Sequence, residues 1–172
     1  RISEQGGVQD VEIRVAPEEK GFQLELWSLV PDRFTVSILS PSGDYVPQIP
    51  LRLGQSQLLK FPLENTTVDV SYRFLEVRSN SHLIIMRFLT PAPGVWTVRV
   101  FSADYLTGLF HMWLPVQTFI REETIFLSPS PDTTLTVPSA TENLIGVAAY
   151  NHNSGSIYIR SGRGYTRTGV VK

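Results

Sequence analysis

Few side chains in this 172-residue chain could do acid–base or nucleophilic chemistry. It has three histidines, His82, His111 and His152, and no cysteine. A serine nucleophile needs a base within hydrogen-bond reach and a third group that orients this base. The sequence has no Gly-x-Ser-x-Gly elbow, and no histidine accompanies a recognisable nucleophile motif. We therefore expect no catalytic residue here, and no hydrolytic activity of the chain by itself.

The surroundings of each histidine favour a structural role. His82 follows Asn80-Ser81, which is typical of a turn. His111 alternates with apolar residues and is expected on a strand. His152 lies in a polar loop over residues 151–155. None of these settings predicts a general base.

The acidic residues show no pattern of metal ligands. Adjacent residues of a strand point to opposite faces, so Glu122 and Glu123 would not share an ion. Asp32, Asp44 and Asp132 each lie near a proline or glycine, as is typical of turns. Without cysteine there is no thiolate site and no disulfide. We predict neither a metal nor a cofactor.

The charge balance argues against two classes of partner. The chain has 15 basic and 16 acidic residues and a net charge of -1, so it has no electrostatic attraction for nucleic acid or an anionic membrane. No apolar run reaches the length of a transmembrane helix. Hydrophobic residues make up 42% and charged residues 18%, which is typical of a globular protein. The cellular location stays open.

Short segments with alternating apolar and polar residues fill the chain up to about residue 118. Leu83-Ile84-Ile85-Met86 is instead a continuous apolar run, which indicates a strand that is covered on both faces. Closely spaced turns, such as Pro41-Ser42-Gly43-Asp44, separate about eight or nine such segments. The pattern predicts an all-β fold, a jelly-roll-like antiparallel β-sandwich. The alternating strands are expected at 11–15, 22–26, 34–38, 67–74, 96–100 and 110–114.

The last quarter of the chain has a different character. Residues 142–151 read Glu-Asn-Leu-Ile-Gly-Val-Ala-Ala-Tyr-Asn, and residues 161–166 read Ser-Gly-Arg-Gly-Tyr-Thr. They resemble the ENVITVGAYN and SSRGPT segments of subtilisin-like serine proteases, which lie between the oxyanion-hole Asn and the nucleophilic Ser. Gly162 replaces the second Ser and Tyr165 replaces the Pro.

The resemblance assigns four residues to the family motif: Asn143, Ser161, Arg163 and Gly164. By the same alignment, Thr136, Val137 and Pro138 correspond to a wall of the primary specificity pocket.

The β-rich part carries a second resemblance. The runs GFQLELW, PAPGVWTVRV and GLFHMWLP are similar to the β-sandwich inserted in clostridial-type subtilisin-like proteases. This implies an inserted β-sandwich over 8–118, a connector over 119–137 and a returning segment of the catalytic core over 138–172.

The two resemblances imply that this chain is an internal piece of a subtilisin-like serine endopeptidase. The parent would hydrolyse peptide bonds with an Asp–His–Ser triad outside this chain. The implied partners are the remainder of the parent and a peptide or protein substrate, with no nucleic acid and no membrane.

The tryptophans support an alternative, a free-standing sandwich that binds carbohydrate or protein. Trp96 shares a face with Val98 and Val100, so we expect it in the core. Trp27 and Trp113 lie opposite their apolar neighbours, where a domain interface or a bound sugar would cover them.

Overall fold

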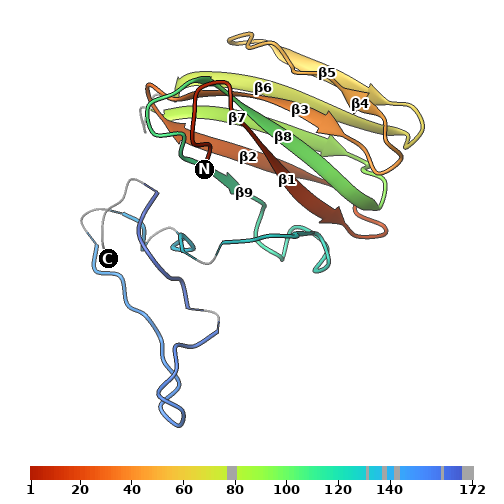
Figure 1. Cartoon of the computed structure of the whole chain (residues 1–172). Coiled ribbons are helices and arrows are strands. Elements are labelled where there is room, and N and C mark those ends of the chain that lie inside the picture. Colours follow the sequence, from red (N-terminus) through yellow and green to blue (C-terminus); the bar gives the residue numbers. More distant parts are fainter. Residues whose placement is uncertain (77–80, 131, 137–138, 142–143, 160, 168–172) are drawn as a thin grey trace. The chain divides into compact units, whose positions relative to one another are not determined.

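The computed structural model describes residues 1–76, 81–130, 132–136, 139–141, 144–159 and 161–167 (Figure 1). They form two compact units, Arg1–Ser128 and Pro129–Lys172, and each is described by itself. None of the described residues lies in a helix, so no helix among them is long and apolar enough to cross a membrane. The predicted site residues Val137, Pro138 and Asn143 lie outside the described residues.

Two five-stranded sheets make up the first unit (Figure 1). The first sheet has the order β10-β1-β8-β3-β4 and the second the order β5-β6-β7-β2-β9. The ladders between these strands are antiparallel. The strands of the first sheet are β1 (Val8–Val15), β3 (Arg33–Leu39), β4 (Tyr45–Val46), β8 (Gly94–Asp104) and β10 (Ile125–Phe126). Those of the second are β2 (Gly21–Leu29), β5 (Ser56–Phe61), β6 (Thr66–Glu76), β7 (Ser81–Leu89) and β9 (Phe110–Trp113).

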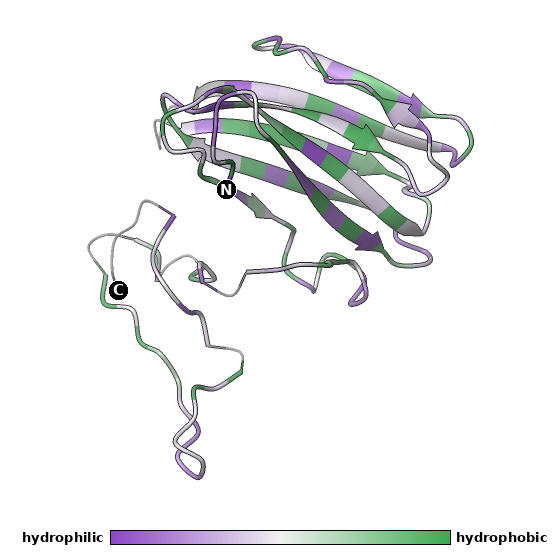
Figure 2. Ribbon diagram, in the orientation of Figure 1, coloured by the Kyte–Doolittle hydropathy of each residue, from purple (hydrophilic) through white to green (hydrophobic). Residues whose placement is uncertain are grey.

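This architecture confirms the predicted all-β antiparallel sandwich. Strand β1 pairs with β8 in one sheet, while β2 pairs with β7 in the other. The chain passes repeatedly from one sheet to the other, although β3 and β4 share the first sheet and β5, β6 and β7 share the second. Because side chains of a strand point alternately to its two faces, the alternating segments place their apolar residues between the sheets. Figure 2 shows this alternation along several strands.

Aromatic rings fill much of the space between the sheets. Phe22 of β2 stacks on Phe88 of β7, with ring centroids 4.7 Å apart. Trp96 of β8 packs edge-on against Phe88 and against Phe61 of β5, and its Nε1 donates to Ala92 O at 2.9 Å. Trp96 is fully buried, which confirms its predicted place in the core. Burial of aromatic area of this size is a large part of the stability of a small domain.

Strand β7 is buried on both faces, as the continuous apolar run predicts. Ile84 and Met86 are fully buried between the sheets, while Leu83 and Ile85 on the outer face are each 5% exposed. In the ladder register, Leu83 lies between Trp27 of β2 and Arg73 of β6, and Ile85 between Glu25 and Ser71.

Some elements differ from the prediction. His82 lies in β7 and is fully buried, so its predicted place in a turn is wrong. Strand β5 was not predicted, because exposed Leu58 and polar Gln57 obscure its alternation. Strands β4 and β10 have two residues each, too few for a period of two to appear. Glu122 and Glu123 lie in a turn rather than on a strand.

Residues on either side of the predicted sandwich also belong to the first unit. Ile2 is 3% exposed, and its amide donates to Gly108 O at 2.8 Å. Beyond β9, Leu127 N donates to Glu12 O at 3.0 Å next to the β1–β10 pairing. The first unit therefore runs through Ser128, whereas the boundaries at 8, 118 and 137 stay predictions.

Candidate functional site

In the second unit, hydrogen bonds join residues 133–134 to residues 163–164 of the second motif segment. Thr134 N donates to Arg163 O at 3.0 Å, and Arg163 N donates to Thr134 Oγ1 at 2.9 Å. An isolated bridge joins Thr133 to Gly164. Thr134 and Arg163, which are 29 positions apart in the sequence, are thus held side by side.

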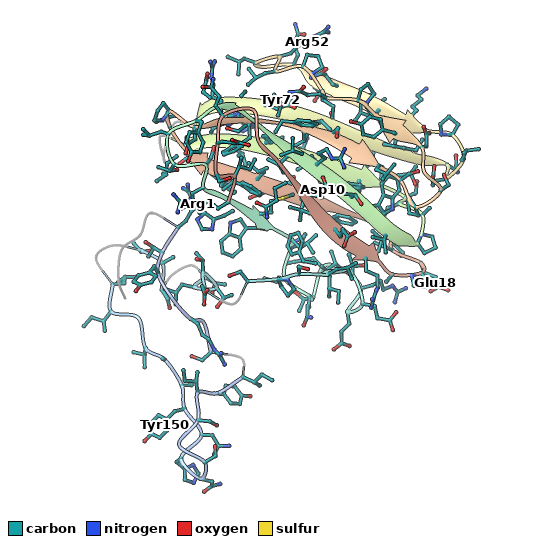
Figure 3. The ribbon with its side chains drawn as sticks, in the orientation of Figure 1. Arg1, Asp10, Glu18, Arg52, Tyr72 and Tyr150 are labelled. Atoms are coloured by element: carbon teal, nitrogen blue, oxygen red, sulfur yellow. The ribbon has the colours of Figure 1, made fainter. Side chains whose placement is uncertain are left out.

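A second contact joins the two motif segments to each other. The amide of Ala149 donates to Ser161 Oγ at 3.1 Å. Between them lies a narrow hairpin whose bridge joins Tyr150 and Ile157, with Tyr150 labelled in Figure 3. His152 lies in the exposed loop of this hairpin, as predicted.

These contacts surround a hollow of about 300 Å³ within the second unit. Among the predicted site residues, Thr136, Arg163 and Gly164 line it together. Ser161 directly precedes the lining residue Gly162, and Ala149, whose amide donates to Ser161 Oγ, directly follows the lining residue Ala148. The other described lining residues are Leu135, Ser139, Gly146, Val147, Ala148, Ile157 and Gly162.

The lining of the hollow includes groups that can bind a ligand. Thr136 and Ser139 offer hydroxyl groups, and Arg163 offers a guanidinium. Among the described residues that line the hollow there is no histidine and no carboxylate. These described residues can supply a surface and hydrogen bonds to a bound group.

The second unit exposes much apolar surface. Ile145, Val147 and Ile159 are 93%, 88% and 84% exposed, and Tyr150 is 72% exposed. No apolar side chain among the described residues of 129–172 is buried. Large exposed apolar patches are typical of surfaces that interact with another protein, a membrane or a ligand.

The histidines of the first unit do not meet in a site. His82 points between the sheets and stacks on Tyr72, with ring centroids 6.3 Å apart. His111 lies on the outer face of β9, next to Trp113. Among the described residues, no group of three or more His, Asp or Glu side chains is placed to hold a metal ion.

A buried carboxylate that the sequence did not single out fixes one end of the sandwich. Asp32 is 1% exposed. Its oxygens accept hydrogen bonds from the amides of Leu106, Thr107 and Gly108 and from the Thr107 hydroxyl. Burial raises the pKa of Asp32, but these hydrogen bonds outweigh it and keep the pKa below its usual value. Asp32, which was predicted only as a turn residue, therefore binds the loop of residues 106–108. We call this set of hydrogen bonds the Asp32 clamp.

Glu19 makes a second such clamp at the other end of β2. Its carboxylate accepts from Gly21 N at 3.3 Å, Arg121 N at 2.8 Å and Thr124 Oγ1 at 3.0 Å. Thr124 Oγ1 in turn accepts from Ala16 N at 3.2 Å. Burial raises the pKa of Glu19, and the hydrogen bonds more than offset this, so its pKa is lowered. The clamp fixes the chain that follows β9 on the sandwich.

Gly164 is predicted to be indispensable for the contact that closes the hollow. Its φ is +86°, and a Cβ there would lie 1.8 Å from Asp132 O. We expect Gly164→Ala to separate residues 132–134 from 163–164. Hydrogen exchange at the amides of Thr134 and Arg163 should then become at least about tenfold faster.

Gly155→Ala is the matched control. Gly155 also has a positive φ, +65°, but its Cβ would meet nothing within 4 Å. This variant should leave exchange at Thr134 and Arg163 unchanged. Equal effects of the two substitutions would show that backbone conformation, and not the close approach to Asp132, controls the contact.

Comparison with known proteins shows an informative likeness. No protein-family model and no curated protein matches this chain. Among solved structures, the CspB protease of Clostridium perfringens is similar, with a TM-score of 0.83 and 25% sequence identity. The likeness covers 95% of this chain and 34% of that protease, so this chain spans about a third of its length. The fold is therefore related to part of a clostridial protease.

Proposed function

We propose that this chain is a noncatalytic accessory part of a subtilisin-like serine endopeptidase. In this proposal, 8–118 is an inserted β-sandwich, 119–137 a connector and 138–172 a returning segment of the catalytic core. The observation that carries it is the extent of the likeness to the clostridial protease, which covers 95% of the chain. A shared sandwich alone would have left residues 129–172 unmatched.

The motif residues of the second unit support this proposal. The segments that resemble subtilisin-like proteases, 142–151 and 161–166, come from separate stretches of sequence. Their described parts meet through Ala149 and Ser161 and around one hollow. Segments that only resembled the family by chance would have no reason to converge on one site.

The exposed apolar residues of the second unit support the same proposal. Ile145 and Val147 lie in the stretch 144–150, which by the resemblance is an interior strand of the proposed parent, and both are exposed in this chain. The remainder of the catalytic core would cover them, and burial of each such side chain stabilises a fold by about 1.5–3 kcal/mol.

For substrate binding, we propose that Thr136 belongs to a wall of the primary specificity pocket, together with Val137 and Pro138. Thr136 lines the hollow next to Arg163 and Gly164, so this wall would be fixed by the 132–134 contact. A wall held by main-chain hydrogen bonds keeps its shape while a substrate side chain enters.

In the proposed reaction, the parent hydrolyses a peptide bond through an acyl-enzyme. A serine outside this chain attacks the carbonyl, a histidine takes its proton, and oxyanion-hole donors stabilise the tetrahedral intermediate. The residues of this chain would bind and orient the substrate, since the described lining of the hollow offers hydroxyls and a guanidinium.

Fluorophosphonate labelling of the full-length protein tests the proposal. This probe modifies only an activated serine, and the sequence of this chain contains no Gly-x-Ser-x-Gly nucleophile motif. We expect one labelled serine per molecule, located by peptide mass spectrometry outside residues 1–172. The chain 1–172 alone should remain unlabelled.

Two results would contradict the proposal. A labelled serine within residues 1–172 would place the nucleophile in this chain. A full-length protein that takes up no label and cleaves no peptide would remove the endopeptidase assignment.

A further inference from the structure

The outer face of the second sheet carries a cluster of three rings at its edge. Trp27 of β2 lies opposite His111 of β9 in the ladder register, and Trp113 lies opposite Glu25. The His111 and Trp113 ring centroids are 6.4 Å apart, and their planes differ by 24°. All three rings are half-buried. Strand β9 is the last strand of this sheet, so the cluster borders an open margin.

A row of hydrogen-bonded polar side chains continues from these rings across the outer face of the sheet. Trp27 Nε1 donates to Glu25 Oε2 at 2.9 Å, and Gln23 Nε2 donates to Glu25 Oε1 at 2.6 Å. Arg87 Nε then donates to Gln23 Oε1 at 3.2 Å, and Arg87 Nη1 approaches Asp69 Oδ2 at 3.4 Å. These contacts hold a carboxylate, an amide and a guanidinium in fixed positions beside the rings.

Little solvent-exposed apolar surface lies beneath this row of polar side chains. Leu83 and Ile85, the aliphatic residues that β7 contributes next to Trp27 and Glu25, are each only 5% exposed. The accessible groups are therefore ring faces and ordered polar atoms. The centre of a protein–protein interface is depleted in charged side chains, so this composition disfavours a protein partner.

A ligand that fits must combine an apolar face with many hydroxyl groups. Sugar rings have this character, because their C–H faces pack on aromatic rings while their hydroxyls meet donors and acceptors at the side. The open margin at β9 would let an extended polymer run past the sheet.

We infer that the outer face of β2 and β9 is a binding site for an extended glycan chain. Trp27 and Trp113 stack on successive sugar rings, while Glu25 and Gln23 bind their hydroxyls. This site goes beyond the proposed function, since it is distinct from the hollow of the second unit and takes no part in peptide hydrolysis. It would give a protease a means of staying on a polysaccharide.

Titration of the full chain with cellohexaose and with chitohexaose, followed by tryptophan fluorescence and calorimetry, tests the inference. We expect saturable binding of at least one of the two. Trp27→Ala and Trp113→Ala should each weaken it by about tenfold or more. Glu25→Gln keeps the shape of the site and should weaken binding without loss of stability, which covers the case in which a tryptophan variant does not fold.

Tyr45→Ala is the matched control, because Tyr45 is an aromatic residue 47% exposed on the other sheet. It should leave glycan binding unchanged. Absence of binding to both oligosaccharides at millimolar concentration would overturn the inference, as would binding that the Trp27, Trp113 and Glu25 variants leave intact. If instead the tryptophan variants bind no less glycan but weaken association with the rest of the full-length protein, the face is a protein interface. Fluorophosphonate labelling is independent of all these outcomes.

Discussion

Replacement of Asp32 with alanine should lower the free energy of unfolding of the full chain by about 3–5 kcal/mol. The change removes the acceptor for three amides, those of Leu106, Thr107 and Gly108, and leaves them buried or half-buried without a partner. Hydrogen bonds to a charged group contribute about 1.5–3 kcal/mol each, and unsatisfied donors add their desolvation cost. Urea unfolding followed by tryptophan fluorescence measures the loss.

The control for this prediction is Asp10→Asn. Asp10 accepts two hydrogen bonds from Arg99, at 2.7 and 2.9 Å, but its side chain is 42% exposed. Exposed ion pairs of this kind contribute about 1 kcal/mol or less. If Asp32→Ala costs no more than Asp10→Asn, then water replaces the Asp32 carboxylate, and the clamp is not a main source of stability.

The Asp32 clamp also explains how the first unit holds residues that precede its first strand. Gly108, which donates to Asp32, accepts a hydrogen bond from Ile2 through its carbonyl. A Cβ at Gly108 would lie 1.9 Å from Ile2 O, so the two segments are in close contact. Loss of the clamp should therefore loosen the 1–7 segment as well as the 105–109 loop.

The fold class was predictable because one face of each sheet is buried, and this imposes an alternation of apolar and polar residues along most of its strands. Val68, Val70 and Tyr72 of β6 alternate with polar residues, and all three are buried between the sheets. A register shift of one residue would have exposed them, so the pattern specifies both strand and face. The same reasoning correctly placed Trp96 inside, and Trp27 and Trp113 outside.

The polar interior was not predictable, because it depends on contacts between residues distant in sequence. Asp32 follows Pro31, which indicates a turn, but its carboxylate binds a loop more than seventy residues further on. Nothing in the local sequence distinguishes this from an exposed turn aspartate. His82 was assigned to a turn for the same reason, since the polar pair before it is typical of a turn whether or not a buried strand follows.

The candidate site was predictable in its parts and not in its geometry. The family resemblance predicts Ser161, Arg163 and Gly164 as motif residues, and the same alignment predicts Thr136 as part of a pocket wall. That Thr136, Arg163 and Gly164 line one hollow depends on the bonds between Thr134 and Arg163 and on the positive φ of Gly164. A glycine in sequence does not indicate which backbone it must approach.

Protonation of His82 should make the chain markedly less stable in weak acid. Burial lowers the pKa of His82 to about 4, and the nearby positive charge of Arg33 contributes in the same direction. The unfolded chain has a histidine pKa near its ordinary value of 6.5. As the pH falls below 6.5, the unfolded state gains a proton that the folded state does not bind, so stability decreases. Between pH 7 and pH 5 this amounts to about 2 kcal/mol.

Urea unfolding at pH 7, 6 and 5 measures this decrease. This pH range lies above the pH at which Asp32, Glu19 and the other carboxylates with lowered pKa take up protons in the folded chain. His82→Phe keeps a ring that stacks on Tyr72 but cannot be protonated, and His82→Gln keeps a polar group. Both variants should lose most of the difference between pH 7 and pH 5, whatever their stability at pH 7. His152→Gln, at an exposed loop position, should keep the difference seen in the unsubstituted chain. If the His82 variants retain the full decrease, another group takes up the proton on unfolding, and His82 is accommodated in its charged form within the sandwich.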